Sequence, residues 1–204
     1  MADFLKFLLA CVAGYFIGNF APSYFLGKIL KRIDIREHGS GNAGATNTFR
    51  VLGTWAGVIV FICDILKGVV AVSLGLWLTG GRLGGMLAGG FAVAGHNWPV
   101  VLSFKGGKGI ASSLGLILVL FPKIGLILFF VALIVVLISK YVSLGSISAA
   151  ILFPILLIVF REPWELCIIG FLIALLAVLR HKENMERLRN GTENQISFLK
   201  KTGR

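Results

Sequence analysis

The sequence predicts an all-α integral membrane protein with about seven transmembrane helices, organised as a single domain over residues 1–204. Hydrophobic residues make up 57% of the chain and charged residues only 14%. This is more apolar surface than one soluble core of this size can bury. The apolar residues are collected in runs of about the length that crosses a bilayer. The polar residues are collected between these runs, so the chain alternates between candidate spans and loops.

The apolar runs define the expected spans. A helix needs about 20 apolar residues to cross the hydrocarbon, and fewer where its ends are embedded in protein. The first run has no basic leader before it and no small-residue cleavage site after it, so we expect a retained span and not a signal peptide. The expected spans are residues 4–26, 51–78, 83–101, 110–121, 124–139, 144–160 and 164–180.

The distribution of lysine and arginine decides whether residues 110–139 form one long helix or two short ones. Pro122 favours a break, because proline lacks a backbone donor and restricts the residue before it. With this break, one membrane face receives most of the basic loop residues, whereas without it the two faces receive nearly equal numbers. Because basic residues favour the cytoplasmic side, we expect seven spans, the amino terminus outside and the carboxyl terminus in the cytoplasm.

Four polar segments then lie at the cytoplasmic face: residues 38–50, 104–109, 140–146 and 180–193. The first contains GSGNAGATN, whose glycines let the backbone approach a ligand closely and whose other side chains offer hydroxyls and amides. Free N–H groups in such a turn can bind an anion. A flexible turn that packs against a helix is the alternative. The candidate ligands are Ser40, Gly41, Asn42, Gly44, Thr46, Asn47 and Arg50.

The second segment, FKGGKG, places two lysines beside two glycines immediately before an apolar run. The N-terminus of the following helix favours an anion. The spacing is not that of a P-loop, and a solvated basic turn is the alternative. His96, just upstream in GHNWP, has either a structural or a binding role. The candidates are His96, Lys105, Gly106, Gly107, Lys108 and Gly109.

The carboxyl-terminal segment is basic and amphipathic. His181, Asn184 and Leu188 have helical spacing and can share one face, and Arg187 belongs to the same segment. A helix at the lipid surface is the alternative explanation. Ser143 and Ser146 add hydroxyls from the neighbouring polar segment.

Three further features lie inside the spans. Asp64 and Lys67 stand three residues apart in the second span, where a helix can pair them. An unpaired charge there costs about 2.5–3.5 kcal/mol on insertion scales, so we expect either a structural ion pair or a binding role. Gly14 and Gly18, like Gly85 and Gly89, have the GxxxG spacing of close helix packing. The three cysteines are far apart and have no metal-site spacing, which predicts packing residues and no metal site.

The three polar motifs resemble those of the bacterial acyl-phosphate:glycerol-3-phosphate acyltransferase family, the PlsY type. The family's S-G-N-x-G-x-T-N loop matches SGNAGATN, its H-N-x-P and G-G-K-G elements match HNWP and FKGGKG, and its tail matches HKENMERLRNGTE. The match spans residues 40–193. The resemblance implies a multi-pass protein of the bacterial cytoplasmic membrane with its active site on the cytoplasmic side.

The implied reaction transfers a fatty acyl group from acyl phosphate to the 1-hydroxyl of sn-glycerol 3-phosphate. Its products are lysophosphatidic acid and inorganic phosphate, and it is the first acylation step of phospholipid biosynthesis. The implied partners are these small molecules and membrane lipids, with no cofactor and no nucleic acid. Neither coenzyme A nor acyl carrier protein is implied as donor.

The resemblance also implies roles for residues at the matching motif positions. The implied catalytic residues are His181, Asn184, Lys105 and Ser143. The implied phosphate and glycerol site contains Ser40, Gly41, Asn42, Gly44, Thr46, Asn47, Arg50, His96, Gly106, Gly107, Lys108, Gly109, Ser146 and Arg187.

No histidine here has an aspartate five residues later, as a His/Asp general base would require. Because acyl phosphate is already activated, we expect direct attack by the glycerol hydroxyl, with its proton passing to a phosphate oxygen or to His181. A membrane carrier for phosphorylated metabolites and a lipid-surface scaffold are the alternatives.

Overall fold

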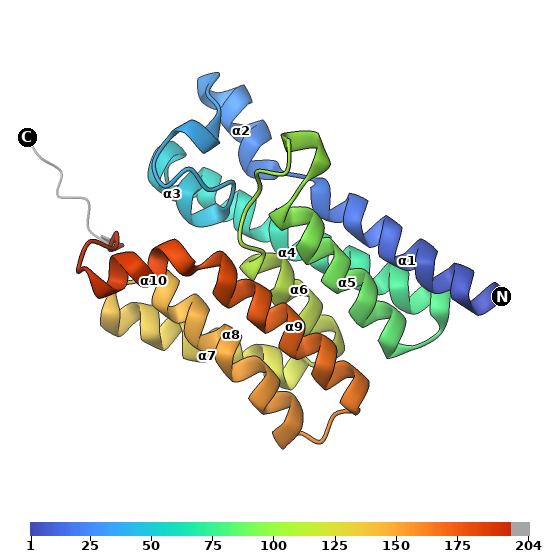
Figure 1. The fold of residues 1–204 in the computed structure, drawn as a ribbon. Helices are drawn as coiled ribbons and strands as arrows, with labels where there is room; N and C mark the ends of the chain where they lie inside the picture. The colour runs from blue at the N-terminus through green and yellow to red at the C-terminus, as the bar shows by residue number, and fades with distance from the viewer. Residues whose placement is uncertain (197–204) are drawn as a thin grey trace, which may run out of the picture.

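The computed structural model describes residues 1–196, which are helical apart from short connections (Figure 1). No strand occurs in this part of the chain. The segments are α1 (Ala2–Asn19), α2 (Pro22–Lys31), η1 (Ile35–Glu37), α3 (Ala45–Leu52), α4 (Thr54–Thr79), α5 (Arg82–Asn97), η2 (Val100–Leu102), α6 (Ile110–Leu120), α7 (Pro122–Ser139), α8 (Val142–Val159), α9 (Trp164–Arg180) and α10 (Lys182–Arg189).

Each expected span contains a helix, but three spans differ from the expectation by three residues or more. The first expected span, residues 4–26, is interrupted, because α1 ends at Asn19 and α2 starts at Pro22, a residue favoured in a helix's first turn. The second starts at Thr54 instead of residue 51, because Gly53, with φ of 94°, separates α3 from α4. The third, expected at 83–101, ends at Asn97. The predicted break at Pro122 is present, with α6 ending at Leu120.

Four stretches among the described residues are long and apolar enough to cross a membrane: Ala2–Lys31, Thr54–Thr79, Pro122–Ser139 and Val142–Val159. A fifth is added if α9 and α10, which are bent by 53° to each other, count together. Helix α6 is apolar but shorter. The all-helical membrane fold is thus shown, whereas seven crossings and the orientation of the termini stay predictions.

The helices form two groups, with α6 between them (Figure 1). In the first group α1 and α4 pack on α5, and in the second α8 packs on α7 and α9, while α6 contacts α4, α5 and α7. The predicted glycine contacts are present in the first group. A Cβ on Gly14 or Gly18 would overlap the backbone of α5 at Ala88 or Ala92. Glycine there lets the two helix backbones approach closely.

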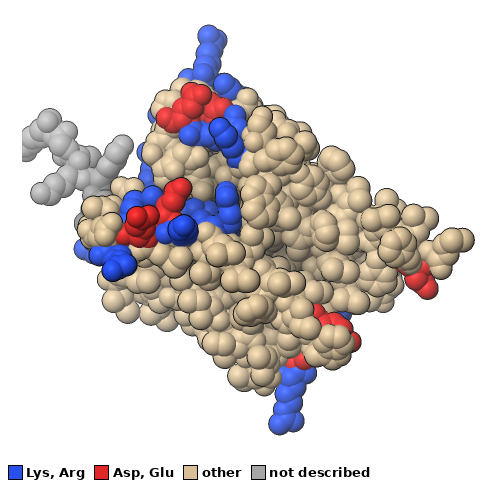
Figure 2. Space-filling model, in the orientation of Figure 1, with Lys and Arg blue, Asp and Glu red and all other residues tan. Residues whose placement is uncertain are grey.

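The surface has an apolar part and a charged part. Large apolar side chains such as Phe4, Ile134, Ile158 and Phe171 are exposed along the helices, as expected for a lipid-facing surface. Lys and Arg gather over α2, α3 and α10 at one end of the face shown in Figure 2, and the middle of that face carries almost no charge. The polar segments identified in the sequence meet at this charged end.

Candidate active site

A cavity of about 330 Å³ lies between α3, α4 and α6 on one side and α7, α8 and α9 on the other. One end is polar and receives the glycine loop before α3, the loop before α6 and the segment around α10. The rest is apolar and runs between α6, α7, α8 and α9. Its polar lining consists of Ser40, Asn42, Thr46, Asn47, Arg50, Asp64, His96, Lys108, Ser113, Ser143, Ser146, His181, Asn184 and Glu193.

Asn47 holds the glycine loop in shape. Its side-chain amide donates to the carbonyls of Ile35 and His38 at 3.1 and 3.0 Å, and its Oδ1 accepts from the backbone N–H of Ser40 at 2.8 Å. Gly39 and Gly41 have φ of 63° and 70°, which favours glycine. Because the polar atoms of Asn47 are occupied by this loop, we assign it a positioning role.

The loop before α6 contributes one lysine to the cavity. Lys108 lines the cavity and donates to Oδ1 of Asn184 on α10. Its pKa is lowered to about 8, chiefly because burial disfavours the charged form and also because Arg187 is nearby. Lys105, three residues earlier, is exposed and lies outside the cavity, beside a surface hollow that it shares with Asp34 and Arg36. The geometry therefore gives the two lysines different environments.

Gly106 and Gly107 serve close packing against the end of α5. Their backbone N–H groups donate to the carbonyls of Asn97 and His96 at 3.2 and 3.0 Å. A Cβ on Gly107 would overlap the imidazole of His96, and one on Gly106 would overlap the His96 carbonyl. Both glycines thus let the loop approach α5, and neither lines the cavity.

Glu193 organises the segment around α10. One carboxylate oxygen accepts from Ser143 at 2.9 Å and from Asn184 at 2.7 Å, and the other accepts from Nε of Arg187 at 2.8 Å. Burial alone would raise the pKa of Glu193, but these bonds outweigh it and lower the pKa. Because the Asn184 amide nitrogen is held by Glu193, its oxygen faces Lys108.

His181, at the junction of α9 and α10, has one ring nitrogen without a hydrogen-bond partner among residues 1–196. It is 3% exposed, and its Nδ1 lies 2.7 Å from the carbonyl of Ala177, which can only accept a hydrogen bond. The proton is therefore on Nδ1 and the lone pair is on Nε2. Burial lowers the pKa of His181 to about 4 despite the bond to Ala177. At neutral pH the ring is therefore uncharged, and its Nε2 lone pair is available as a weak base.

Asp64, Lys67 and His96 form a buried cluster at the inner wall of the cavity. The ammonium of Lys67 lies 2.8 Å from Asp64, 2.5 Å from Nδ1 of His96 and 2.9 Å from the carbonyl of Phe20, in the connection between α1 and α2. The expected ion pair is present, and it also orients His96. Asp64 and His96 also line the cavity, and a binding role for Asp64 stays a prediction.

Most of the residues that the sequence predicts for the site line this one cavity. They are Ser40, Asn42, Gly44, Thr46, Asn47, Arg50, His96, Lys108, Gly109, Ser143, Ser146, His181 and Asn184. Five predicted residues do not line it: Gly41, Lys105, Gly106, Gly107 and Arg187. Sequence reasoning did not assign Glu193 to the site, although it ends the HKENMERLRNGTE motif, which also contains Glu183 and Glu186.

Comparison with known proteins shows likeness over nearly the whole chain. The glycerol-3-phosphate acyltransferase family model matches residues 8–191. A glycerol-3-phosphate acyltransferase of Thermoanaerobacter pseudethanolicus is 45% identical over 189 residues, covering 93% of this chain and 95% of that protein. One of Clostridioides difficile is 43% identical over 205 residues, covering 97% and 99%.

Two crystal structures of PlsY, described as an integral membrane glycerol 3-phosphate acyltransferase, have the same fold. The glycerol 3-phosphate form has a TM-score of 0.88 and 34% identity, covering 94% of this chain and 96% of that chain. The lysophosphatidic acid form has a TM-score of 0.85 and 35% identity, covering 94% and 95%.

Proposed function

The chain belongs to the glycerol-3-phosphate acyltransferase family, and from its cavity we propose that it transfers a fatty acyl group from acyl phosphate to the 1-hydroxyl of sn-glycerol 3-phosphate. Membership of the family implies acylation of glycerol 3-phosphate. Our proposal concerns the acyl donor, acyl phosphate, and the hydroxyl that is acylated. One observation supports it most strongly. A single cavity has a polar end with Arg50 and Lys108 and an apolar remainder between helices, which suits two phosphates and one acyl chain.

The polar and apolar parts of the cavity suggest how the substrates are arranged. The phosphate groups lie at the polar end, near Lys108, Arg50 and the hydroxyls and amides of the glycine loop. The acyl chain lies along the apolar wall formed by α7 and α8. The relatives' crystal structures are described as glycerol 3-phosphate and lysophosphatidic acid forms, which supports these two compounds as substrate and product.

The chemistry needs positioning more than a strong base. The glycerol 1-oxygen forms a bond to the acyl carbonyl carbon, and the bond from that carbon to the phosphate oxygen breaks. The hydroxyl proton passes to a phosphate oxygen or to Nε2 of His181. Lys108, with Asn184 beside it, stabilises the negative charge that develops on the carbonyl and phosphate oxygens. The products are 1-acyl-glycerol 3-phosphate and inorganic phosphate.

We place the reaction at the cytoplasmic face of a bacterial inner membrane. The basic residues gathered at the polar end of the molecule support this side. A cysteine introduced at the exposed Glu186 of α10, in a chain without Cys11, Cys63 and Cys167, tests it. A membrane-impermeant maleimide should label this cysteine only after intact cells are permeabilised. Labelling of intact cells would contradict the placement.

Reconstitution separates this function from that of a carrier for phosphorylated metabolites. Purified protein in lipid vesicles receives radiolabelled glycerol 3-phosphate with acyl phosphate, with acyl coenzyme A or with no donor. We expect labelled lysophosphatidic acid only with acyl phosphate, and about 10- to 100-fold slower formation of it in Lys108→Met. Movement of unmodified glycerol 3-phosphate into the vesicles, without any acylated product, would support the carrier instead.

A further inference from the structure

The apolar part of the cavity has a closed inner end. Phe153 of α8 is 2% exposed, and with Ile117 of α6, Leu128 of α7 and Ile173 of α9 it lines that end and belongs to the buried core. The ring of Phe153 packs edge-on against Phe121 at a centroid distance of 6.2 Å, which fixes its position. The cavity therefore does not continue along α8 beyond Phe153.

The wall that leads from the polar end to Phe153 is lined by small residues. On α8 the lining residues after Ser143 are Ser146, Ala149, Ala150 and then Phe153. These positions lie on one helix face, and the alanines leave room that larger residues would fill. One flank is more open, because Phe129 and Leu133 of α7 are each 39% exposed. A chain lying in the slot thus meets Phe153 at its end and the bilayer at its side.

From this geometry we propose that Phe153 sets the number of acyl carbons that the protein itself binds. The inference rests on the proposed function, because it identifies the slot's occupant as the acyl chain of the donor. The polar end already holds the phosphate groups, and an acyl chain is the apolar part of that substrate. Carbons beyond Phe153 leave by the open flank into lipid and gain no further contact with the protein.

The length of the slot gives the number of carbons. Ser143 and Phe153 are ten residues apart on α8, which corresponds to about 15 Å at the helical rise per residue. An extended carbon chain advances about 1.25 Å per methylene, from its bond length and tetrahedral angle. The slot therefore accommodates about twelve carbons.

The measurable consequence is a break in the chain-length dependence of the reaction. Below about twelve carbons, each added methylene should raise kcat/KM about fourfold, because it is buried against the protein. Above that length kcat/KM should level off. Phe153→Ala should move the break outward by about three carbons, the approximate length of the lost ring. Ala150→Phe, whose ring enters the slot earlier, should move it inward by about four carbons.

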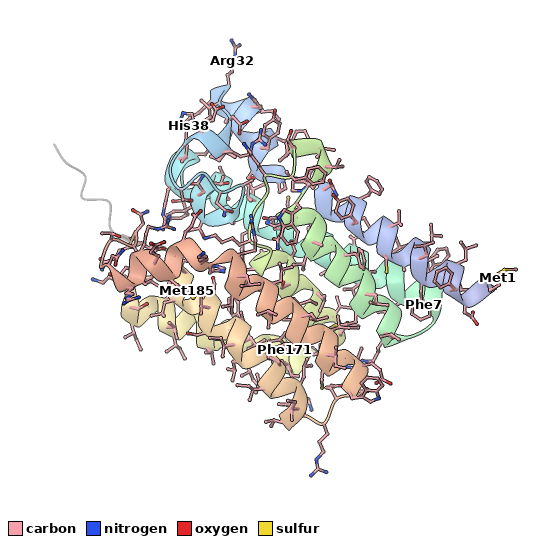
Figure 3. All side chains as sticks on the ribbon, viewed as in Figure 1. Met1, Phe7, Arg32, His38, Phe171 and Met185 are labelled. Atoms are coloured by element: carbon pink, nitrogen blue, oxygen red, sulfur yellow. The ribbon has the colours of Figure 1, made fainter. Side chains whose placement is uncertain are left out.

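Acyl phosphates of eight to eighteen carbons, assayed with the wild type and both variants in nanodiscs, test this. Phe171→Ala is the matched control, since Phe171, labelled in Figure 3, lies on α9, is 55% exposed and does not line the cavity. Phe153→Ala opens the core, so its thermal midpoint is followed in parallel. Ala150→Phe retains the core contacts of Phe153 and keeps the inference testable if Phe153→Ala fails to fold.

A second readout separates the inference from the function. Non-reactive alkyl phosphates of the same lengths should raise the thermal midpoint up to the same break, shifted in the same variants. If the chain length at which kcat/KM levels off were unchanged in Ala150→Phe, or shifted equally in Phe171→Ala, Phe153 would not have the proposed role. Acylation of glycerol 3-phosphate would still support the proposed function. Chain-dependent stabilisation with the expected shifts, but without acylation of glycerol 3-phosphate, would instead overturn the function and leave the slot in place.

Discussion

The hydroxyl of Ser143, at the start of α8, donates a hydrogen bond of 2.9 Å to the carboxylate of Glu193, fifty residues further along the chain. The same carboxylate oxygen accepts from Asn184 at 2.7 Å. Glu193 therefore joins the segment after α10 to α8 and fixes the Asn184 amide whose oxygen faces Lys108. Without this carboxylate, the side chains of Ser143, Asn184 and Arg187 would lose their common partner.

Glu193→Gln should lower kcat by about 10- to 100-fold, since a bond to a charged group contributes about 1.5–3 kcal/mol. The glutamine keeps the shape of the side chain but removes its charge, and with it the ion pair to Arg187. Steady-state acylation rates measure the effect. Glu186→Gln, at an exposed position of α10, is the control and should retain full activity. Equal acylation rates for the two variants would show that the charge of Glu193 does not contribute to catalysis.

Lys108→Met should lower kcat/KM about 10- to 100-fold, because it removes the buried ammonium that faces Asn184. Lys105→Met, at the exposed position outside the cavity, should change kcat/KM by less than about threefold. Initial rates at varied glycerol 3-phosphate compare the two. A larger loss from Lys105→Met would return that lysine to the catalytic role implied by the motif and would mean that the loop moves on substrate binding.

The pKa of Lys108 gives a pH dependence. Since burial lowers this pKa to about 8, the ammonium form that pairs with phosphate is lost as pH rises through about 8, and kcat/KM should fall with it. In Lys108→Arg this alkaline limb should disappear, because arginine stays protonated at such pH values. A pH profile from 6 to 10 of both proteins measures it. If kcat/KM of Lys108→Arg fell at alkaline pH as in the wild type, the fall would be due to titration of another group.

The buried pair of Asp64 and Lys67 makes a prediction about stability. Lys67→Met leaves the Asp64 carboxylate buried without its partner, and breaking such a pair costs about 3–5 kcal/mol. Lys67→Met with Asp64→Asn removes both charges and should be less destabilised than Lys67→Met alone. Thermal unfolding in detergent ranks the two. If the double variant melts lower than the single one, the ion pair contributes less than the other contacts of these side chains.

The sequence predicted the helical membrane fold and the meeting of the polar segments, because apolar runs and glycine-rich loops depend on local composition. It could not separate Lys105 from Lys108, since both stand beside the same glycines and only the packing of Gly106 and Gly107 against His96 decides which one faces inward. It could not assign Glu193 either. Its partner Ser143 belongs to another helix, and such a contact depends on tertiary structure.

The interruption between α1 and α2 depends on both sequence and tertiary structure. Residues 4–26 form one apolar run, and Pro22 within it is a sequence signal for a break, as Pro122 is for residues 110–139. In the fold, the carbonyl of Phe20 in the connection accepts from Lys67 of α4. A helical turn at this point would use that carbonyl within its own backbone ladder, so the tertiary bond and the following Pro22 together favour the interruption.

The central claim is that one cavity holds both substrates at once, so that the acyl group passes directly between them. Initial-rate kinetics with varied acyl phosphate and glycerol 3-phosphate test this most directly. The account predicts intersecting double-reciprocal lines, and no phosphate release before glycerol 3-phosphate is added. Parallel lines, with a burst of phosphate and an acyl adduct on Ser40 or Ser143 in the absence of acceptor, would contradict it.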